Sequence, residues 1–226
     1  MLGKAVAAVK KLPLAKQVST HLLELGAKKI APCMGCHKCA GTRGECIVRD
    51  DFQSIRDQWV KADVILYSVP VYHLGIPGQL KCFLDRLGNS LRKVYQGIPS
   101  PRRLKVVGAI AQGAHLFSGQ EAAVSFLLQH AVLMRCVPVT GDGWESYLGA
   151  AGWTRAQKSP QAIKEAHSQD EMDARVAVRA CETLTQRCVE MALIIKTGGR
   201  ALREILEADP VYDPFLKNLD RSLPHK

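Results

Sequence analysis

Four of the eight cysteines in this 226-residue chain lie close together between residues 33 and 46. Two residues separate the first from the second and the second from the third, and six separate the third from the fourth: Cys33, Cys36, Cys39 and Cys46. Glycines in the same stretch let backbone amides turn toward the sulfur atoms, which suits an anionic centre. Thiolates are soft ligands that select iron–sulfur clusters or zinc. The spacing therefore predicts a metal centre on these four cysteines.

The spacing also bears on which metal is bound. Zinc sites more often combine two separated Cys-x2-Cys pairs, whereas a three-cysteine run with a nearby fourth favours a [4Fe–4S] cluster. A bacterial ferredoxin has a proline after its fourth cysteine, but Ile47 follows here. The pattern favours [4Fe–4S], with zinc or empty thiols as open alternatives. The other cysteines are expected to be buried, unreactive thiols: Cys82, Cys136, Cys181 and Cys188.

Composition limits the compartment and the partners. The chain has no run of about 18 apolar residues, and its N-terminus lacks the apolar centre of a signal peptide. We therefore expect a cytoplasmic protein without a membrane partner, and a reducing cytosol disfavours disulfides. The net charge is +10, and residues 1–50 carry nine of the 31 Lys and Arg residues but three of the 21 Asp and Glu residues. This basic end could attract an anionic cofactor or an acidic redox partner, or simply be solvated. Nucleic acid is disfavoured because no binding motif accompanies the charge.

Hydrophobic periodicity predicts alternating strands and helices that would position the cysteines. We expect strands at residues 17–25, 64–69, 104–113 and 135–142, and helices at residues 2–12, 50–62, 78–91, 120–134 and 170–196. The strand at 64–69 is nearly continuous in apolar residues, as in a strand covered on both faces. Thr197–Gly199 is expected to end the last helix. This order predicts an α/β fold with a doubly wound parallel sheet.

Two glycine-containing loops follow predicted strands, at residues 68–78 and 111–121. The carboxyl ends of parallel strands are where such sheets bind ligands. The first loop offers free backbone amides and the aromatic ring of Tyr72, which suit a flat heterocycle. On the pattern alone, ligand binding and ordinary structural turns are equally good interpretations.

Three stretches together resemble a known family: "PCMGCHKC", "ECIVRDDFQSI" and "ADVILYSVPVYHLGIPGQLKCFLDR". They resemble the iron–sulfur flavoproteins of the flavodoxin-like, NADPH-dependent FMN reductase superfamily, over roughly residues 17–142. The resemblance implies FMN at the carboxyl edge of the sheet. Its contacts would be Ser68, Pro70, Val71 and Tyr72 on one side and Gln112 and Gly113 on the other. It also implies a flavodoxin-like FMN-binding domain at residues 1–150, with the cysteine loop at 32–46, and a C-terminal helical extension at 151–226.

The chain departs from that family at its start. Members normally open with a strand and a loop that grips the FMN phosphate, whereas residues 1–12 resemble the end of the helix that follows. The first strand of the sheet would then be missing. A truncated sequence, residues 2–9 acting as a strand, or loss of tight FMN binding would each explain this, and we favour truncation.

The combined features predict an oxidoreductase that passes electrons between NAD(P)H or ferredoxin and a small-molecule acceptor through FMN and a [4Fe–4S] cluster. No catalytic side chain is assigned. The resemblance implies a homodimer or higher homo-oligomer in which cluster and flavin approach across subunits. Two alternatives stay open: an FMN-dependent quinone or nitro reductase without a cluster, and a non-enzymatic metal-binding or interaction protein that has lost flavin.

Overall fold

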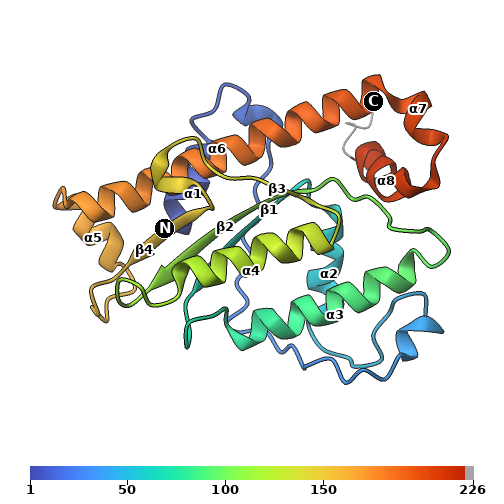
Figure 1. The fold of residues 1–226 in the computed structure, drawn as a ribbon, viewed down its shortest axis with the longest axis horizontal. Helices are drawn as coiled ribbons and strands as arrows, with labels where there is room; N and C mark the ends of the chain where they lie inside the picture. The colour runs from blue at the N-terminus through green and yellow to red at the C-terminus, as the bar shows by residue number, and fades with distance from the viewer. Residues whose placement is uncertain (222–226) are drawn as a thin grey trace.

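The computed structural model describes residues 1–221, which fold around a four-stranded parallel sheet (Figure 1). The strands are β1 (Val64–Pro70), β2 (Val106–Gly113), β3 (Val137–Pro138) and β4 (Ala150–Trp153). β1 pairs with one edge of β2, while β3 and β4 pair with the first and second halves of β2. β2 is therefore the central strand, and its residues are almost all buried.

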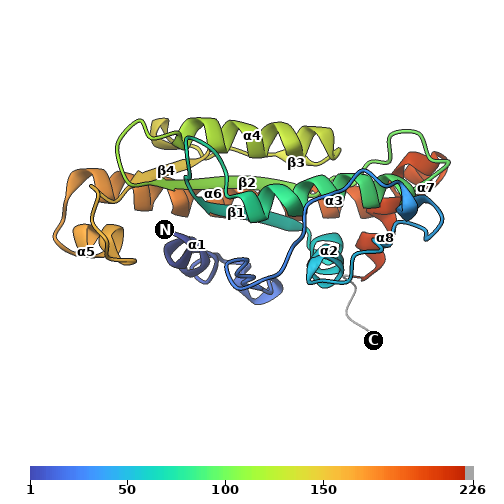
Figure 2. The same ribbon diagram turned by 90° about the horizontal axis from the view of Figure 1, so that it is seen from below.

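Helices cover both faces of this sheet, as Figures 1 and 2 show. α2 (Phe52–Lys61), α3 (Gly78–Val94) and α4 (Gln120–Leu133) share one apolar core with β2. α1 (Leu2–Val9) and α6 (Met172–Ala201) share a second core on the opposite face. The predicted doubly wound α/β fold is thus confirmed, and so are the helices expected near residues 2–12, 50–62, 78–91 and 120–134.

The strand expected at residues 17–25 is wrong. Residues 15–17 form a short 3-10 turn (η1, Ala15–Gln17), and the rest of this segment is extended but pairs with no strand among residues 1–221. Leu23 and Leu25 do pack against the core, so the alternation that suggested a strand is real. A strand also needs a neighbouring ladder of backbone hydrogen bonds. β1 has no second neighbour within the described residues to supply one.

Two further expectations about the strands are not met. Most of β1 is only half-buried, so this strand is not covered on both faces as its apolar run suggested. Residues 2–9 form the helix α1, which packs against α6. They therefore do not act as the missing strand.

α6 is longer than predicted, because it continues through Gly198 and Gly199 to Ala201. A Cβ at Gly199 would lie 2.5 Å from the ring of Phe215, so this glycine permits close packing of α8 (Asp213–Arg221) rather than ending the helix. In the centre of α6, Ala180, Leu184 and Cys188 are buried against the sheet.

The C-terminal helical extension is confirmed, with α5 (Ala162–Ser168), α7 (Arg203–Glu207) and α8 (Asp213–Arg221) beside α6. β4 begins at Ala150 and α6 packs on the sheet. The domain division at residue 150 stays a prediction. Three further short 3-10 turns are η2 (Lys38–Ala40), η3 (Trp144–Ser146) and η4 (Pro210–Tyr212). Within residues 1–221, every helix is too short or too polar to cross a bilayer.

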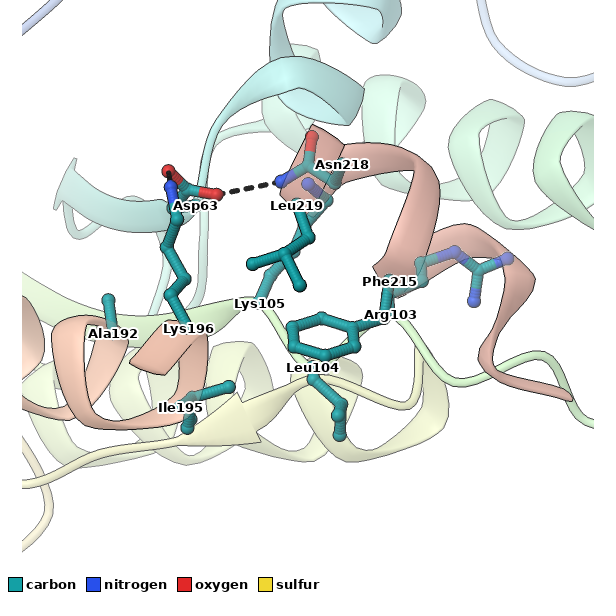
Figure 3. Close-up of a pocket in the computed structure, with 10 residues that line it drawn as sticks. All are labelled: Asp63, Arg103, Leu104, Lys105, Ala192, Ile195, Lys196, Phe215, Asn218 and Leu219. Carbon is teal, nitrogen blue, oxygen red and sulfur yellow. Dashed lines mark hydrogen bonds and ion pairs between the residues drawn. The ribbon is translucent and has the colours of Figure 1, made fainter. Parts of the chain in front are cut away.

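Asp63, next to the start of β1, ties the C-terminal helices to the sheet (Figure 3). It accepts a hydrogen bond from Asn218 Nδ2 at 2.8 Å and pairs with Lys196 Nζ at 2.5 Å. Lys105 lines the same small pocket, and its Nζ donates to the backbone oxygen of Val60 at 2.7 Å. This pocket is about 10 Å³, which is room for little more than a water molecule and too small for a substrate. The contacts of Asp63 around it anchor the C-terminal helices to the sheet.

Candidate functional site

The four clustered cysteines line a single open cavity of about 180 Å³. The second half of α3 forms the opposite wall, so we call this space the cysteine cavity; its other lining residues include Pro32, Met34, Ile47, Val48, Arg86, Asn89, Ser90, Arg92 and Lys93. Cys33 and Cys36 are exposed, whereas Cys39 and Cys46 are half-buried. Residues far apart in sequence therefore enclose the sulfur atoms from two sides.

Tight turns shape the cysteine loop, as its glycines suggested. Gly44 has a φ of +90°, and a Cβ there would lie 2.7 Å from the backbone oxygen of Ser90. The Gly44 carbonyl accepts hydrogen bonds from Ser90 Oγ at 2.5 Å and from Arg56 Nη1 at 3.1 Å. This glycine thus lets the return of the loop lie directly on α3, which brings Cys46 back toward the other three cysteines.

A buried ion pair holds the base of the loop. Arg86 Nη1 lies 2.5 Å from Asp50 Oδ2, with 2% and 9% of the two side chains exposed. The guanidinium also donates to the backbone oxygens of Ala31 and Val48, which flank the cysteine run on both sides. Burial raises the pKa of Asp50, but hydrogen bonds from Arg86, Ala31 and Phe52 outweigh burial and leave it below its usual value.

Two donors on α3 face the sulfur atoms. Asn89 Nδ2 lies 3.4 Å from Cys33 Sγ, within the range of a hydrogen bond to sulfur. Arg86 Nε is buried and has no hydrogen-bond partner among residues 1–221. Burial lowers the pKa of Arg86, but the Asp50 carboxylate and the neighbouring Cys46 thiol outweigh it and raise the pKa overall. The wall of the cysteine cavity therefore carries the Arg86 cation, whose Nε–H makes no hydrogen bond in the described residues.

Four thiols and an unused buried donor fit a thiolate-bound, anionic centre by their chemistry. The sulfur atoms share the cavity without being assembled around a point. Within residues 1–221, no three His, Cys, Asp or Glu side chains meet at metal-binding distances. The metal ligands Cys33, Cys36, Cys39 and Cys46 thus stay a prediction.

Three of the other cysteines are buried as expected, and burial raises the pKa of Cys136 to about 11 and those of Cys181 and Cys188 to about 12. Cys82 is half-buried.

The predicted flavin contacts come together at the other end of α3. Ser68 and Pro70 belong to β1, Gln112 and Gly113 end β2, and Pro70 lies opposite Gln112 in the sheet register. Val71 N donates to Gln112 O at 2.9 Å. Tyr72 is 60% exposed. The six residues thus form one rim at the carboxyl edge of the sheet, and their binding of FMN stays a prediction.

The two loops at this rim also contact each other. A Cβ at Gly119 would lie 2.5 Å from Leu74 Cα, and Gly119 has a φ of +104°. The sequence analysis missed a third segment here, because Ala150–Trp153 has few of the β-branched and aromatic residues that mark strands. β4 carries Thr154 to the rim, where its N–H donates to Gly113 O at 3.0 Å.

The cysteine loop and this rim lie toward opposite ends of α3 (Figure 1), and the cysteine cavity is lined by residues in the second half of that helix. α3 begins at Gly78, just after the loop that carries Tyr72, whereas Asn89 faces Cys33. Eleven residues of helix correspond to about 16 Å. On one chain, the turn of α3 that faces Cys33 is therefore about 16 Å along the helix from the end that follows the rim loop.

Comparisons with known proteins place this geometry among flavoproteins. The profile of the NADPH-dependent FMN reductase family matches residues 3–145. An iron-sulfur flavoprotein from Archaeoglobus fulgidus is 32% identical over 136 residues, which are 60% of this chain and 67% of that protein. One from Methanocaldococcus jannaschii is 29% identical over 140 residues, 62% of this chain and 69% of that protein.

Among solved structures, RosB with bound 8-demethyl-8-formylriboflavin-5'-phosphate superposes with a TM-score of 0.60 at 12% identity. The match covers 90% of this chain and 78% of RosB. At this identity the likeness concerns the fold, and it extends over the C-terminal helices as well as the sheet.

Proposed function

Because the chain belongs to the NADPH-dependent FMN reductase family, we propose that it transfers electrons through FMN and an iron–sulfur cluster held by the four clustered cysteines. The donor would be NAD(P)H or a ferredoxin, and the acceptor a small molecule. Bound flavin would exchange electrons in pairs or singly, and the cluster singly. The protein's own part is to hold, orient and insulate these groups.

The flavin half of the proposal is supported by the rim at the carboxyl edge. Parallel sheets bind ligands at this edge, and the family match covers both of the strands that form it. The exposed ring of Tyr72 can cover one face of a flat ligand. Ser68, Pro70, Val71, Gln112 and Gly113 would then border the flavin. RosB, whose fold resembles that of this chain, has the phosphorylated flavin 8-demethyl-8-formylriboflavin-5'-phosphate bound.

The cluster half is carried by one observation: all four cysteines line one cavity whose buried wall has a hydrogen-bond donor without a partner in the described part of the chain. A buried N–H without a partner costs free energy, so such groups usually meet a ligand or water. Thiolate sulfur would satisfy Arg86 Nε and would be stabilised by the guanidinium charge. The two relatives from Archaeoglobus fulgidus and Methanocaldococcus jannaschii are iron-sulfur flavoproteins, which favours the same assignment.

The separation of the two sites favours a complex of two or more copies. On one chain, about 16 Å of α3 lies between the rim and the cysteine cavity. The cavity is open and carries exposed cysteines, so a neighbouring copy could bring its rim to it. We therefore propose a homodimer or higher homo-oligomer in which electrons pass between subunits.

Anaerobic purification of the full chain, with iron, sulfide, zinc and FMN quantified together, tests this function. We expect about four iron and four sulfide ions per chain with FMN. FMN without iron would instead indicate a quinone or nitro reductase. Zinc without flavin would indicate a non-enzymatic metal-binding protein. Anaerobic reduction of the bound flavin by NADPH, NADH or a reduced ferredoxin would then identify the donor.

A further inference from the structure

We propose that Arg86 and Asn89 are positioning residues that donate hydrogen bonds to the metal-bound sulfurs of Cys46 and Cys33 and thereby set the reduction potential of the centre. This inference rests on the proposed function. It assigns a role to two side chains on α3 that are not themselves ligands.

Helix geometry places both donors on one side of the cavity. Residues three apart on a helix lie on the same face, and Arg86 and Asn89 both line the cysteine cavity. Asn89 Nδ2 already lies 3.4 Å from Cys33 Sγ. Together they form a two-point support for sulfur atoms at the first and last positions of the cysteine motif.

The surroundings of Arg86 hold it in place for this role. Its Nη1 is held by Asp50 and Ala31 and its Nη2 by Val48, while the buried Nε makes no hydrogen bond within residues 1–221. The guanidinium carbon also lies 4.2 Å from the centre of the Phe52 ring. A side chain held at so many points loses little further freedom when its Nε–H meets a ligand.

Hydrogen bonds to cluster sulfurs change the reduction potential of the cluster as well as supporting its structure. Reduction adds negative charge to the centre, so a donor stabilises the reduced form more than the oxidised form. Removing a donor should therefore shift the midpoint potential to a more negative value. Partners that orient metal ligands also affect affinity, and their loss typically weakens metal binding about 10- to 100-fold.

A simple charge effect would act differently. Arg92 lines the same cavity and is exposed, but it makes no hydrogen bond to a cysteine sulfur within the described residues. If positive charge alone set the potential, removing Arg92 would shift it at least as much as removing the neutral amide of Asn89. The pair of variants therefore separates a hydrogen bond from a general field.

The test compares Asn89→Ala, Asn89→Gln, Arg86→Lys and the charge control Arg92→Gln in the full chain, reconstituted anaerobically with iron and sulfide. We expect a more negative midpoint potential and an altered EPR spectrum for Asn89→Ala and Arg86→Lys, partial recovery in Asn89→Gln, and a smaller shift for Arg92→Gln. Because Asn89 is exposed, its variants keep the test valid if Arg86→Lys fails to fold. An unchanged potential in Asn89→Ala, or an equal shift in Arg92→Gln, would overturn the inference.

A second readout separates this inference from the proposed function. Affinity for Co²⁺, measured by chelator competition, depends on the sulfur site but not on any redox activity. If the wild type takes up Co²⁺ but no iron, the proposed function fails, and a loss of about tenfold or more in Asn89→Ala would still support the donor role. If the wild type binds neither metal, both fail.

Discussion

Arg86 Nη1 lies 2.5 Å from Asp50 Oδ2 in a pocket where both side chains are almost fully buried. This ion pair joins α3 to Asp50, which lies two residues before α2, and the cysteine loop begins and ends beside it. The Arg86–Asp50 ion pair therefore both supports the fold and holds the cysteine loop in place. The stability of the chain and its capacity to hold a metal should respond together when the contact is changed.

The first prediction concerns this pair. Asp50→Asn should lower the free energy of unfolding by about 3 kcal/mol, because it leaves a buried guanidinium without its counter-charge. Asp57→Asn removes the exposed partner of Arg56 and should cost less than about 1 kcal/mol. Urea unfolding of the metal-free chains measures both. Equal losses in the two variants would contradict a special role for Asp50.

The same pair predicts a pH dependence. The pKa of Asp50 is lowered in the folded chain, so its stabilising contribution is fully present above the unfolded pKa of about 4. It is lost as the pH falls through the lower, folded pKa. The stability difference between wild type and Asp50→Asn should therefore shrink as unfolding is measured at progressively more acidic pH.

The second prediction uses the turn that seats the cysteine loop on α3. Gly44→Ala places a Cβ 2.4 Å from Val94 Cγ2 at a φ of +90°, so it should destabilise the chain by about 1–2 kcal/mol or more and reduce metal uptake. Gly41→Ala lies in the same loop at a φ of −79°, with its nearest neighbour at 3.9 Å, and should be nearly neutral. Unfolding and iron content measure both effects. A neutral Gly44→Ala would show that the loop tolerates another path.

Much of the framework was predictable from the sequence, because its signals are local. The apolar spacing of Phe52, Ile55 and Trp59 predicted α2, and all three are buried. The strand expected at residues 104–113 is β2, whose residues are almost all buried. These patterns can be recognised without knowing which distant segments pack there, because the spacing of apolar residues within one helix or strand indicates which of its residues are buried.

The errors fall where a distant partner decides the outcome. Residues 17–25 alternate like a strand but find no ladder in the described chain, whereas Ala150–Trp153 has weak strand propensity and pairs because β2 offers an edge. Gly199 reads as a helix end, but it admits Phe215. At the site, the cysteine spacing was visible in advance. The part of α3 that faces the sulfurs was not, because its contacts span more than 30 residues.

The third prediction concerns the pocket of Figure 3. Burial lowers the pKa of Lys105 to about 8, below its unfolded value of about 10.4. Between these values the unfolded chain binds the extra proton, so the contribution of Lys105 to stability rises with pH by about 2–3 kcal/mol. Lys105→Met has no ionisable side chain at this position, so it lacks this pH-dependent contribution to stability. The stability of wild type relative to Lys105→Met should therefore increase from pH 8 to pH 10.

This comparison cancels the buried thiols of Cys181 and Cys188, which ionise on unfolding in both chains, whereas the Lys105 charge also acts on the Cys136 thiol. Burial raises the pKa of Cys136 to about 11, so its contribution falls with pH over part of the same range. Wild type alone would mix the two effects. A difference between the chains that stays constant with pH would mean that Lys105 keeps its charge in the folded state.

The fourth prediction tests the rim. Tyr72→Ala removes an exposed ring at the carboxyl edge and should weaken FMN binding about tenfold, whereas Tyr72→Phe keeps the ring face and should bind almost as wild type. Quenching of FMN fluorescence on titration with the full chain measures both affinities. Equal affinity in the two variants would remove Tyr72 from the flavin site.

The central claim, a cluster on the cysteine loop separate from a flavin at the sheet edge, is tested most directly by counting cofactors in Cys39→Ser. Iron, sulfide and FMN per chain are measured after anaerobic purification, with Cys82→Ser as the matched control because Cys82 lies on α3 outside the cysteine cavity. We expect Cys39→Ser to lose its iron and sulfide but keep FMN, and Cys82→Ser to keep all three. Iron retained in Cys39→Ser, or iron and flavin lost together, would contradict the account.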